Sequence, residues 1–248
     1  MNPIFDLRIT KLIWLLACAC FFAGAALAGD DANGNEIQIQ TTLKQLLGEL
    51  QAERYGEIVP AGEVISWRVY IPANESEEPP GVLVYVSPTR SGESHPRWRA
   101  VMDRQNLIYI SADWSGNRKP VNRRMVLAIM AVRVLAQSYA FDSDRIMISG
   151  FSGGGRVASI LSVQYPEVFS GALYICGVDF WNKRRAPKVE RLTQNRFVFL
   201  TGSKDFNRDE VRNIYGRYIK AGATNSKLII IPTMTHELPN RKYLNIAL

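Results

Sequence analysis

Histidine and cysteine are scarce in this chain of 248 residues, which has two histidines and three cysteines. Cys18 and Cys20 lie close to the N-terminus, so only Cys176 remains in the rest of the chain. A single cysteine excludes an internal disulfide there, and its apolar neighbours indicate a buried thiol. Because zinc sites need several clustered histidine or cysteine ligands, we expect no metal, and the sequence indicates no other cofactor.

Acidic residues are outnumbered, with 23 Asp and Glu against 30 Lys and Arg, which gives a net charge of +7. The basic residues are scattered, apart from residues 183–185 and the pair Arg123 and Arg124. Scattered charge is typical of a solvated surface, so we expect no nucleic-acid partner. An anionic partner such as a polysaccharide stays compatible with the net positive charge.

The longest apolar run lies at the N-terminus, from residue 12 to 27, after the basic residues Arg8 and Lys11. It ends in Ala-Leu-Ala before Gly29, which is typical of a signal-peptide cleavage site. We therefore expect residues 1–28 to be removed and the protein to be exported, to the periplasm or beyond, with no stable membrane span afterwards. A transmembrane anchor and lipidation at Cys18 are the disfavoured alternatives, because the run is short and alanine-rich and continues well past Cys18.

The remaining chain has the length of one domain. Residues 29–60 are expected to hold a flexible polar start, over residues 29–38, followed by an amphipathic helix. The helix is predicted because leucines recur at helical spacing at positions 43, 46, 47 and 50. Residues 61–248 are expected to form a single domain. Its first element is predicted to be a half-buried antiparallel strand over residues 65–71, where apolar and polar residues alternate.

Beyond residue 80 the pattern changes to short apolar runs separated by helical stretches. The runs predict strands buried on both faces, at residues 82–86, 107–110, 146–148, 172–175, 197–200 and 228–231. Strands that alternate with helices predict an α/β fold, with a mostly parallel sheet covered by helices on both faces. Ligands bind such sheets at the carboxyl ends of the strands.

One of these strand ends carries the sequence Gly-Phe-Ser-Gly-Gly, centred on Ser152. A G-x-S-x-G sequence between a strand and a helix is typical of a nucleophile elbow, in which a tight turn presents the serine hydroxyl above the sheet edge. We expect the N–H of Gly153, at the start of the helix, to point toward the attacked carbonyl group. The glycines at 153–155 are explained by this turn and do not indicate a nucleotide-binding loop.

A serine nucleophile needs a base and an orienting acid. His236 follows the last predicted strand and is the expected base, whereas His95 is expected to be a surface or rim residue. Asp205 follows the penultimate strand in a turn that contains glycine, and it is preferred as the acid over Asp179. Nothing in the sequence itself excludes Asp179.

A second N–H for the oxyanion is expected from the loop after the strand at 82–86, which begins Ser87-Pro88. Because proline has no N–H, Thr89 is the expected donor, with Arg90 as the alternative.

Together with the segment 165–172, these motifs resemble those of secreted α/β-hydrolases, and most closely the polyhydroxybutyrate depolymerase and feruloyl esterase-like group. The resemblance covers roughly residues 64–240 and preserves the order serine, aspartate, histidine. It implies hydrolysis of a carboxylic ester through an acyl-enzyme on Ser152. Many relatives carry His-Gly where this chain has Ser87-Pro88, and some secreted members have disulfides that this chain lacks. A single-domain serine peptidase and a catalytically weak binding protein of the same fold are the alternatives.

The region where larger hydrolases insert a lid is short here, covering residues 177–196. It holds Phe180, Trp181 and several basic residues, which favours an open cleft with an aromatic and basic rim. The expected substrate is then an ester on something bulky or anionic. The equally weighted alternative is that Trp181 packs against the domain. The sequence does not predict the oligomeric state.

Overall fold

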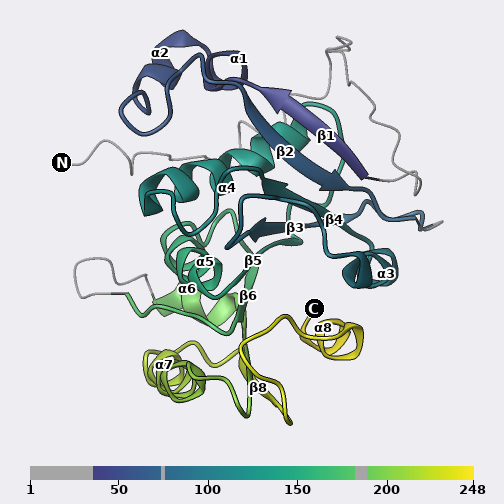
Figure 1. Cartoon of the computed structure of the whole chain (residues 1–248), viewed down its shortest axis with the longest axis vertical. Helices are drawn as coiled ribbons and strands as arrows, with labels where there is room; N and C mark the ends of the chain where they lie inside the picture. Colours follow the sequence, from purple (N-terminus) through teal and green to yellow (C-terminus); the bar gives the residue numbers. More distant parts are fainter. Residues whose placement is uncertain (1–35, 74–75, 182–188) are drawn as a thin grey trace.

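The computed structural model describes residues 36–73, 76–181 and 189–248 (Figure 1). The expected signal peptide, at residues 1–28, lies outside this range, as do the basic residues 183–185. Within the described residues, no helix is long and apolar enough to cross a membrane.

Eight strands in this part of the chain form one sheet, in the order β1-β2-β4-β3-β5-β6-β7-β8. Their bounds are β1 Glu36–Thr41, β2 Ile65–Tyr70, β3 Gly81–Val86, β4 Leu107–Ala112, β5 Ile146–Phe151, β6 Gly171–Ile175, β7 Arg196–Gly202 and β8 Ser226–Ile231. Strand β2 is antiparallel to both β1 and β4, and every pairing from β4 to β8 is parallel. The predicted α/β sheet with an antiparallel N-terminal strand is therefore confirmed.

Helices cover both faces of the sheet. Their bounds are α1 Leu43–Leu47, α2 Glu49–Glu53, α3 Pro96–Gln105, α4 Val121–Ala136, α5 Gly153–Gln164, α6 Val189–Gln194, α7 Arg208–Lys220 and α8 Arg241–Ala247. Helices α3 and α8 lie on one face, while α4, α5 and α7 lie on the other (Figure 1). Each face has its own apolar core, because successive side chains of a strand point to opposite faces.

The N-terminal region departs from prediction. Residues 36–38 were expected to be flexible, but they begin β1, which pairs with β2 along its whole length. The single amphipathic helix expected over residues 43–50 is two short helices, because Gly48 has φ 78° and ends α1. This break turns Leu50 outward, and its side chain is 82% exposed.

Strand β8 was predicted to be buried on both faces, and this is wrong. It is the last strand of the sheet, and its exposure alternates along the chain, with Ile229 buried and Ile230 exposed. Ile229 and Ile231 are buried on the face that α8 covers, whereas Leu228 and Ile230 lie on the face of α7, which covers this edge strand incompletely.

Candidate active site

Ser152 occupies the turn between β5 and α5 in a strained backbone conformation, with φ 56° and ψ −120°. Its N–H donates to the carbonyl of Ile175 on the neighbouring strand, at 2.8 Å. A non-glycine residue with positive φ costs on the order of 1–3 kcal/mol, which the surrounding sheet and helix must offset. The turn places the serine at the carboxyl edge of the sheet, where the sequence predicted it.

The glycines around Ser152 are required by close backbone contacts. A Cβ atom on Gly154 would lie 1.9 Å from the carbonyl oxygen of Val86, and one on Gly155 would lie 2.1 Å from that of Gly177. Val86 ends strand β3 in the middle of the sheet, and its backbone cannot move away without breaking hydrogen bonds between strands. Helix α5 can therefore begin this close to the sheet only with glycine at these positions.

Replacing Gly154 with alanine is expected to destabilise the protein by about 3 kcal/mol or more, because the new methyl group overlaps the backbone of β3. Gly216 is a matched control, since a Cβ atom there meets nothing within 4 Å and the residue lies inside helix α7. Gly216→Ala is expected to be neutral or to stabilise by up to about 1 kcal/mol. Urea denaturation measures both, and equal stability of the two variants would contradict the packing described.

The structure brings Ser152, His236 and Asp205 into one hydrogen-bonded chain. The Nε2 atom of His236 lies 2.9 Å from the Ser152 Oγ, and its Nδ1 atom lies 2.8 Å from Asp205 Oδ1. His236 comes from the segment between β8 and α8, and Asp205 from the turn after β7. Three strand ends that are far apart in sequence thus bring a serine, a histidine and an aspartate together, the residue types that can act as a nucleophile, a base and an acid.

The Asp205 side chain is fully buried, and its carboxylate accepts hydrogen bonds from several donors. The N–H of Asn207 donates to Oδ1 at 3.0 Å, and the Thr201 hydroxyl donates to Oδ2 at 2.7 Å. Burial alone would raise the pKa of Asp205, but these hydrogen bonds, with those of Cys176 and His236, lower it overall. Asp205 is therefore ionised at neutral pH and holds the proton of His236 on Nδ1, which leaves Nε2 free to accept.

Replacing Thr201 with valine is expected to cost about 1.5–3 kcal/mol at pH 7, the range for a hydrogen bond to a charged group. The folded-state pKa of Asp205 lies below its unfolded value near 3.9, so this stabilisation is present above that value. It is lost as the pH falls through the folded pKa, so the difference between variant and wild type should shrink below about pH 4. Urea denaturation at pH 7 and at successively lower pH tests this, with the exposed Thr193→Val as control; a difference that stays constant down to the lowest pH at which the protein folds would contradict it.

The two alternative residues lie in other environments. Asp179 forms an ion pair with Arg156 at 2.8 Å. His95 caps the start of α3, where its Nδ1 accepts from the N–H of Arg97 at 3.2 Å. Burial, and then the nearby Arg97 charge, lowers the pKa of His95.

Cys176 lies closer to the site than its apolar neighbours in sequence indicate. It is fully buried, has φ 55° and directs its thiol toward the carbonyl of Glu237 at 3.6 Å. Ligand atoms of Cys176, Asp205 and His236 lie within 4.8 Å of one another, so these are the described side chains that could approach a common metal ion. Burial, and then the Asp205 carboxylate, raises the pKa of the thiol far above its ordinary value, which keeps it protonated and a poor ligand.

Thr89, the predicted second oxyanion donor, lies in the loop after β3. Its N–H donates to the Ser87 Oγ at 3.2 Å, so in this structure that amide is engaged within its own loop. The carboxamide of Asn117, which the sequence analysis did not single out, lies beside Gly153: a Cβ atom there would be 2.4 Å from its Oδ1. Asn117 reaches this place because its own N–H donates to the carbonyl of Pro88, joining the loops after β3 and β4.

The aromatic residues at the site are also different from those expected. Phe206, 77% exposed, stacks on the His236 ring at 4.1 Å between centroids, and Phe151 lies at 4.9 Å. The predicted rim residues Phe180 and Trp181 instead stack on each other and contact Tyr218. They line a cavity of about 330 Å³ between α5 and α7. Ser152, His236 and Asp205 are not among the residues that line it.

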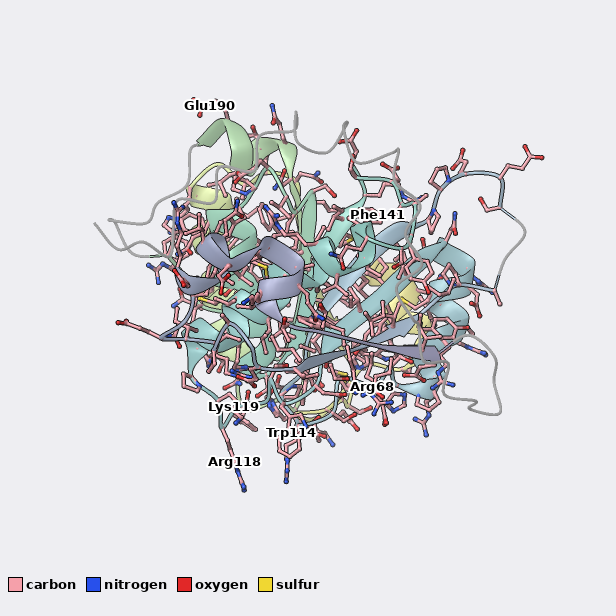
Figure 2. The ribbon with its side chains drawn as sticks, turned by 90° about the horizontal axis from the view of Figure 1, so that it is seen from above. Arg68, Trp114, Arg118, Lys119, Phe141 and Glu190 are labelled. Carbon is pink, nitrogen blue, oxygen red and sulfur yellow. The ribbon has the colours of Figure 1, made fainter. Side chains whose placement is uncertain are left out.

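Basic side chains gather beside the loop after β4. Trp114, Arg118 and Lys119 project from one rim of the molecule (Figure 2). The guanidinium of Arg90 lies 3.8 Å above the Trp114 ring. Since this loop also carries Asn117, the basic rim is close to Gly153.

No family model matches the sequence, and no curated protein sequence matches it either. Solved structures do match. A thermostable esterase matches 69% of this chain with a TM-score of 0.52 at 18% identity, and the chain spans only 52% of that esterase. A ferulic acid esterase matches 87% of this chain and 95% of its own, with a TM-score of 0.57 at 15% identity. An S-formylglutathione hydrolase from Staphylococcus aureus matches 86% of this chain and 96% of its own, with a TM-score of 0.57 at 11% identity.

At these identities the likeness is one of fold. The strand order, the parallel sheet and the serine turn between β5 and α5 define the α/β-hydrolase fold, which this chain has. Because one fold hosts many activities, the activity of this chain has to be argued from its own residues.

Proposed function

We propose that this protein is a serine hydrolase that cleaves a carboxylic ester through an acyl-enzyme on Ser152. The observation that carries the proposal is the chain from the Ser152 hydroxyl through His236 to the ionised Asp205, with contacts of 2.9 and 2.8 Å. The esterases among the structures of the same fold add support from analogy.

In the proposed reaction, His236 Nε2 takes the proton of Ser152 as Oγ attacks the ester carbonyl. The tetrahedral intermediate collapses, the C–O bond to the alcohol breaks, and His236 gives its proton to the leaving oxygen. Water, deprotonated by the same nitrogen, then attacks the acyl carbon. The bond from that carbon to the Ser152 Oγ breaks, His236 returns the proton to Oγ, and the acid is released. Asp205 stays ionised throughout and stabilises the imidazolium.

The oxyanion in this scheme is bound by the N–H of Gly153, at the positive end of helix α5. Thr89 is proposed as the second donor, and its N–H would have to exchange the Ser87 hydroxyl for the oxyanion. Arg90 is the alternative donor on the same loop. No metal or cofactor takes part in the proposed reaction.

The proposed substrate is an ester on an anionic or polymeric carrier. The protein is proposed to act on it outside the cytoplasm, once residues 1–28 are removed. Support comes from Arg90, Arg118 and Lys119 around the exposed Trp114, rather than from Phe180 and Trp181. Cations near the mouth of a site raise the local concentration of anionic substrates.

A fluorophosphonate probe tests the proposal because it reacts only with an activated serine. The wild-type protein and the control Ser226→Ala are expected to be labelled, whereas Ser152→Ala is not. An unlabelled wild type would favour the weak binding protein of the same fold. Labelling combined with turnover of peptides but not esters would favour the serine peptidase.

A further inference from the structure

Arg124, in the first turns of helix α4, is a buried cation that is bound by backbone carbonyls. Its side chain is 3% exposed. Its Nε donates to the carbonyl of Ser115 at 2.7 Å, its Nη1 to that of Gly153 at 3.2 Å and its Nη2 to that of Ser87 at 3.1 Å. Hydrogen bonds from a charged donor are about twice as strong as neutral ones, so the guanidinium holds the three backbone segments firmly together.

The three carbonyls belong to the three segments that border Ser152. Ser87 begins the loop after β3, which carries Thr89, and Ser115 belongs to the loop after β4, which carries Asn117. Gly153 is the first residue of α5 and the proposed oxyanion donor. One guanidinium therefore sets the spacing of every segment from which an oxyanion donor is proposed.

The buried charge of Arg124 has no counter-charge among the described residues. Ion pairs within the described residues do not include Arg124, so no carboxylate there neutralises it. A buried charge without a counter-charge costs free energy that an apolar side chain would not. Burial lowers the pKa of Arg124 to about 10, so the guanidinium remains charged at neutral pH.

We propose that Arg124 is a positioning residue of the oxyanion hole, whose charge also favours the negatively charged tetrahedral intermediate. The inference rests on the proposed esterase function. Since Nη1 contacts the carbonyl oxygen of Gly153, the guanidinium lies within about 7 Å of the N–H of the same residue. At that distance the positive charge of Arg124, which is itself buried, acts on an oxyanion that exists only during the reaction. The effect should therefore fall on kcat rather than on KM.

The experiment compares Arg124→Met and Arg124→Lys with the wild type and with Arg133→Met, a control on the opposite end of the same helix. It measures kcat and KM for p-nitrophenyl acetate, the Kd of an alkyl boronic acid that forms a tetrahedral adduct on the serine, and Tm. Arg124→Met is expected to lower kcat about 100-fold with KM changed less than about 3-fold, and to weaken boronic acid binding by a similar factor to kcat. Arg124→Lys retains the charge but reaches fewer carbonyls, so its kcat should fall about 10-fold. Arg133→Met should leave all three kinetic and binding constants within about 2-fold of wild type.

A folded Arg124→Met protein whose kcat and boronic acid Kd stay within about 3-fold of wild type would overturn the inference. If that variant does not fold, Arg124→Lys decides: a lower Tm with wild-type kcat would make the residue purely structural. If the wild-type protein shows no turnover, or if its turnover does not depend on Ser152, both the proposed function and this inference are overturned. Wild-type turnover that survives in Arg124→Met would overturn the inference alone.

Discussion

Replacing Ser152 with alanine is expected to lower kcat for p-nitrophenyl acetate by about 10⁴- to 10⁶-fold, the range for loss of a serine nucleophile. The variant removes the one atom, Oγ, that His236 Nε2 contacts at 2.9 Å, and adds nothing to the turn. Folding should be preserved, because alanine leaves the backbone hydrogen bond to Ile175 intact. Turnover of the acetate, butyrate and octanoate esters at mildly alkaline pH, with Tm as a check on folding, measures the effect.

Ser159→Ala is a suitable control on the same helix, since that hydroxyl bonds within α5 and to the N–H of Asp179. It should retain wild-type kcat within a few-fold. Equal rates for the wild type and Ser152→Ala would mean that the elbow is not the catalyst. The chain-length profile of the wild type would begin to define the size of the acyl site.

The second large effect is expected for Asp205→Asn, about 10⁴-fold in kcat. An asparagine can donate a hydrogen bond from its amide, which would favour the His236 tautomer with its proton on Nε2 and so block acceptance from Ser152. The matched control is Asp179→Asn, because Asp179 was the competing acid in sequence and pairs with Arg156 in the structure. Rates measured across pH 6–10 test both variants. A loss in Asp179→Asn that equals or exceeds that in Asp205→Asn would reverse the assignment of the acid.

The sheet could be predicted because its strands are short, continuous apolar runs. The runs that became β3 to β7 are buried on both faces, so their composition alone separates them from the amphipathic helices between them. Strand β1 shows the opposite case. Its alternation of Ile37 and Ile39 with polar residues was a usable signal, but the polar residues made the segment resemble an unstructured start.

Residues in the order serine, aspartate and histidine could be located because each follows a strand, and parallel strands end at one edge. The residues around them could not. Phe206, Asn117 and Arg124 reach the site through contacts between segments that are far apart in the chain. Neither hydrophobic periodicity nor a local motif encodes such contacts. Cys176 was correctly predicted to be buried, but its contact with Asp205 results from the packing of β6 against β7 and could not be read from the sequence.

The most direct test of the proposed reaction is to observe the acyl-enzyme. When the wild-type protein is mixed with p-nitrophenyl acetate, we expect a burst of p-nitrophenol equal to the enzyme concentration. After an acid quench, peptide mass spectrometry should find one added acetyl group, located on Ser152. An acetyl group on another residue, or steady turnover with no acylated peptide, would contradict the central claim that Ser152 carries the acyl intermediate.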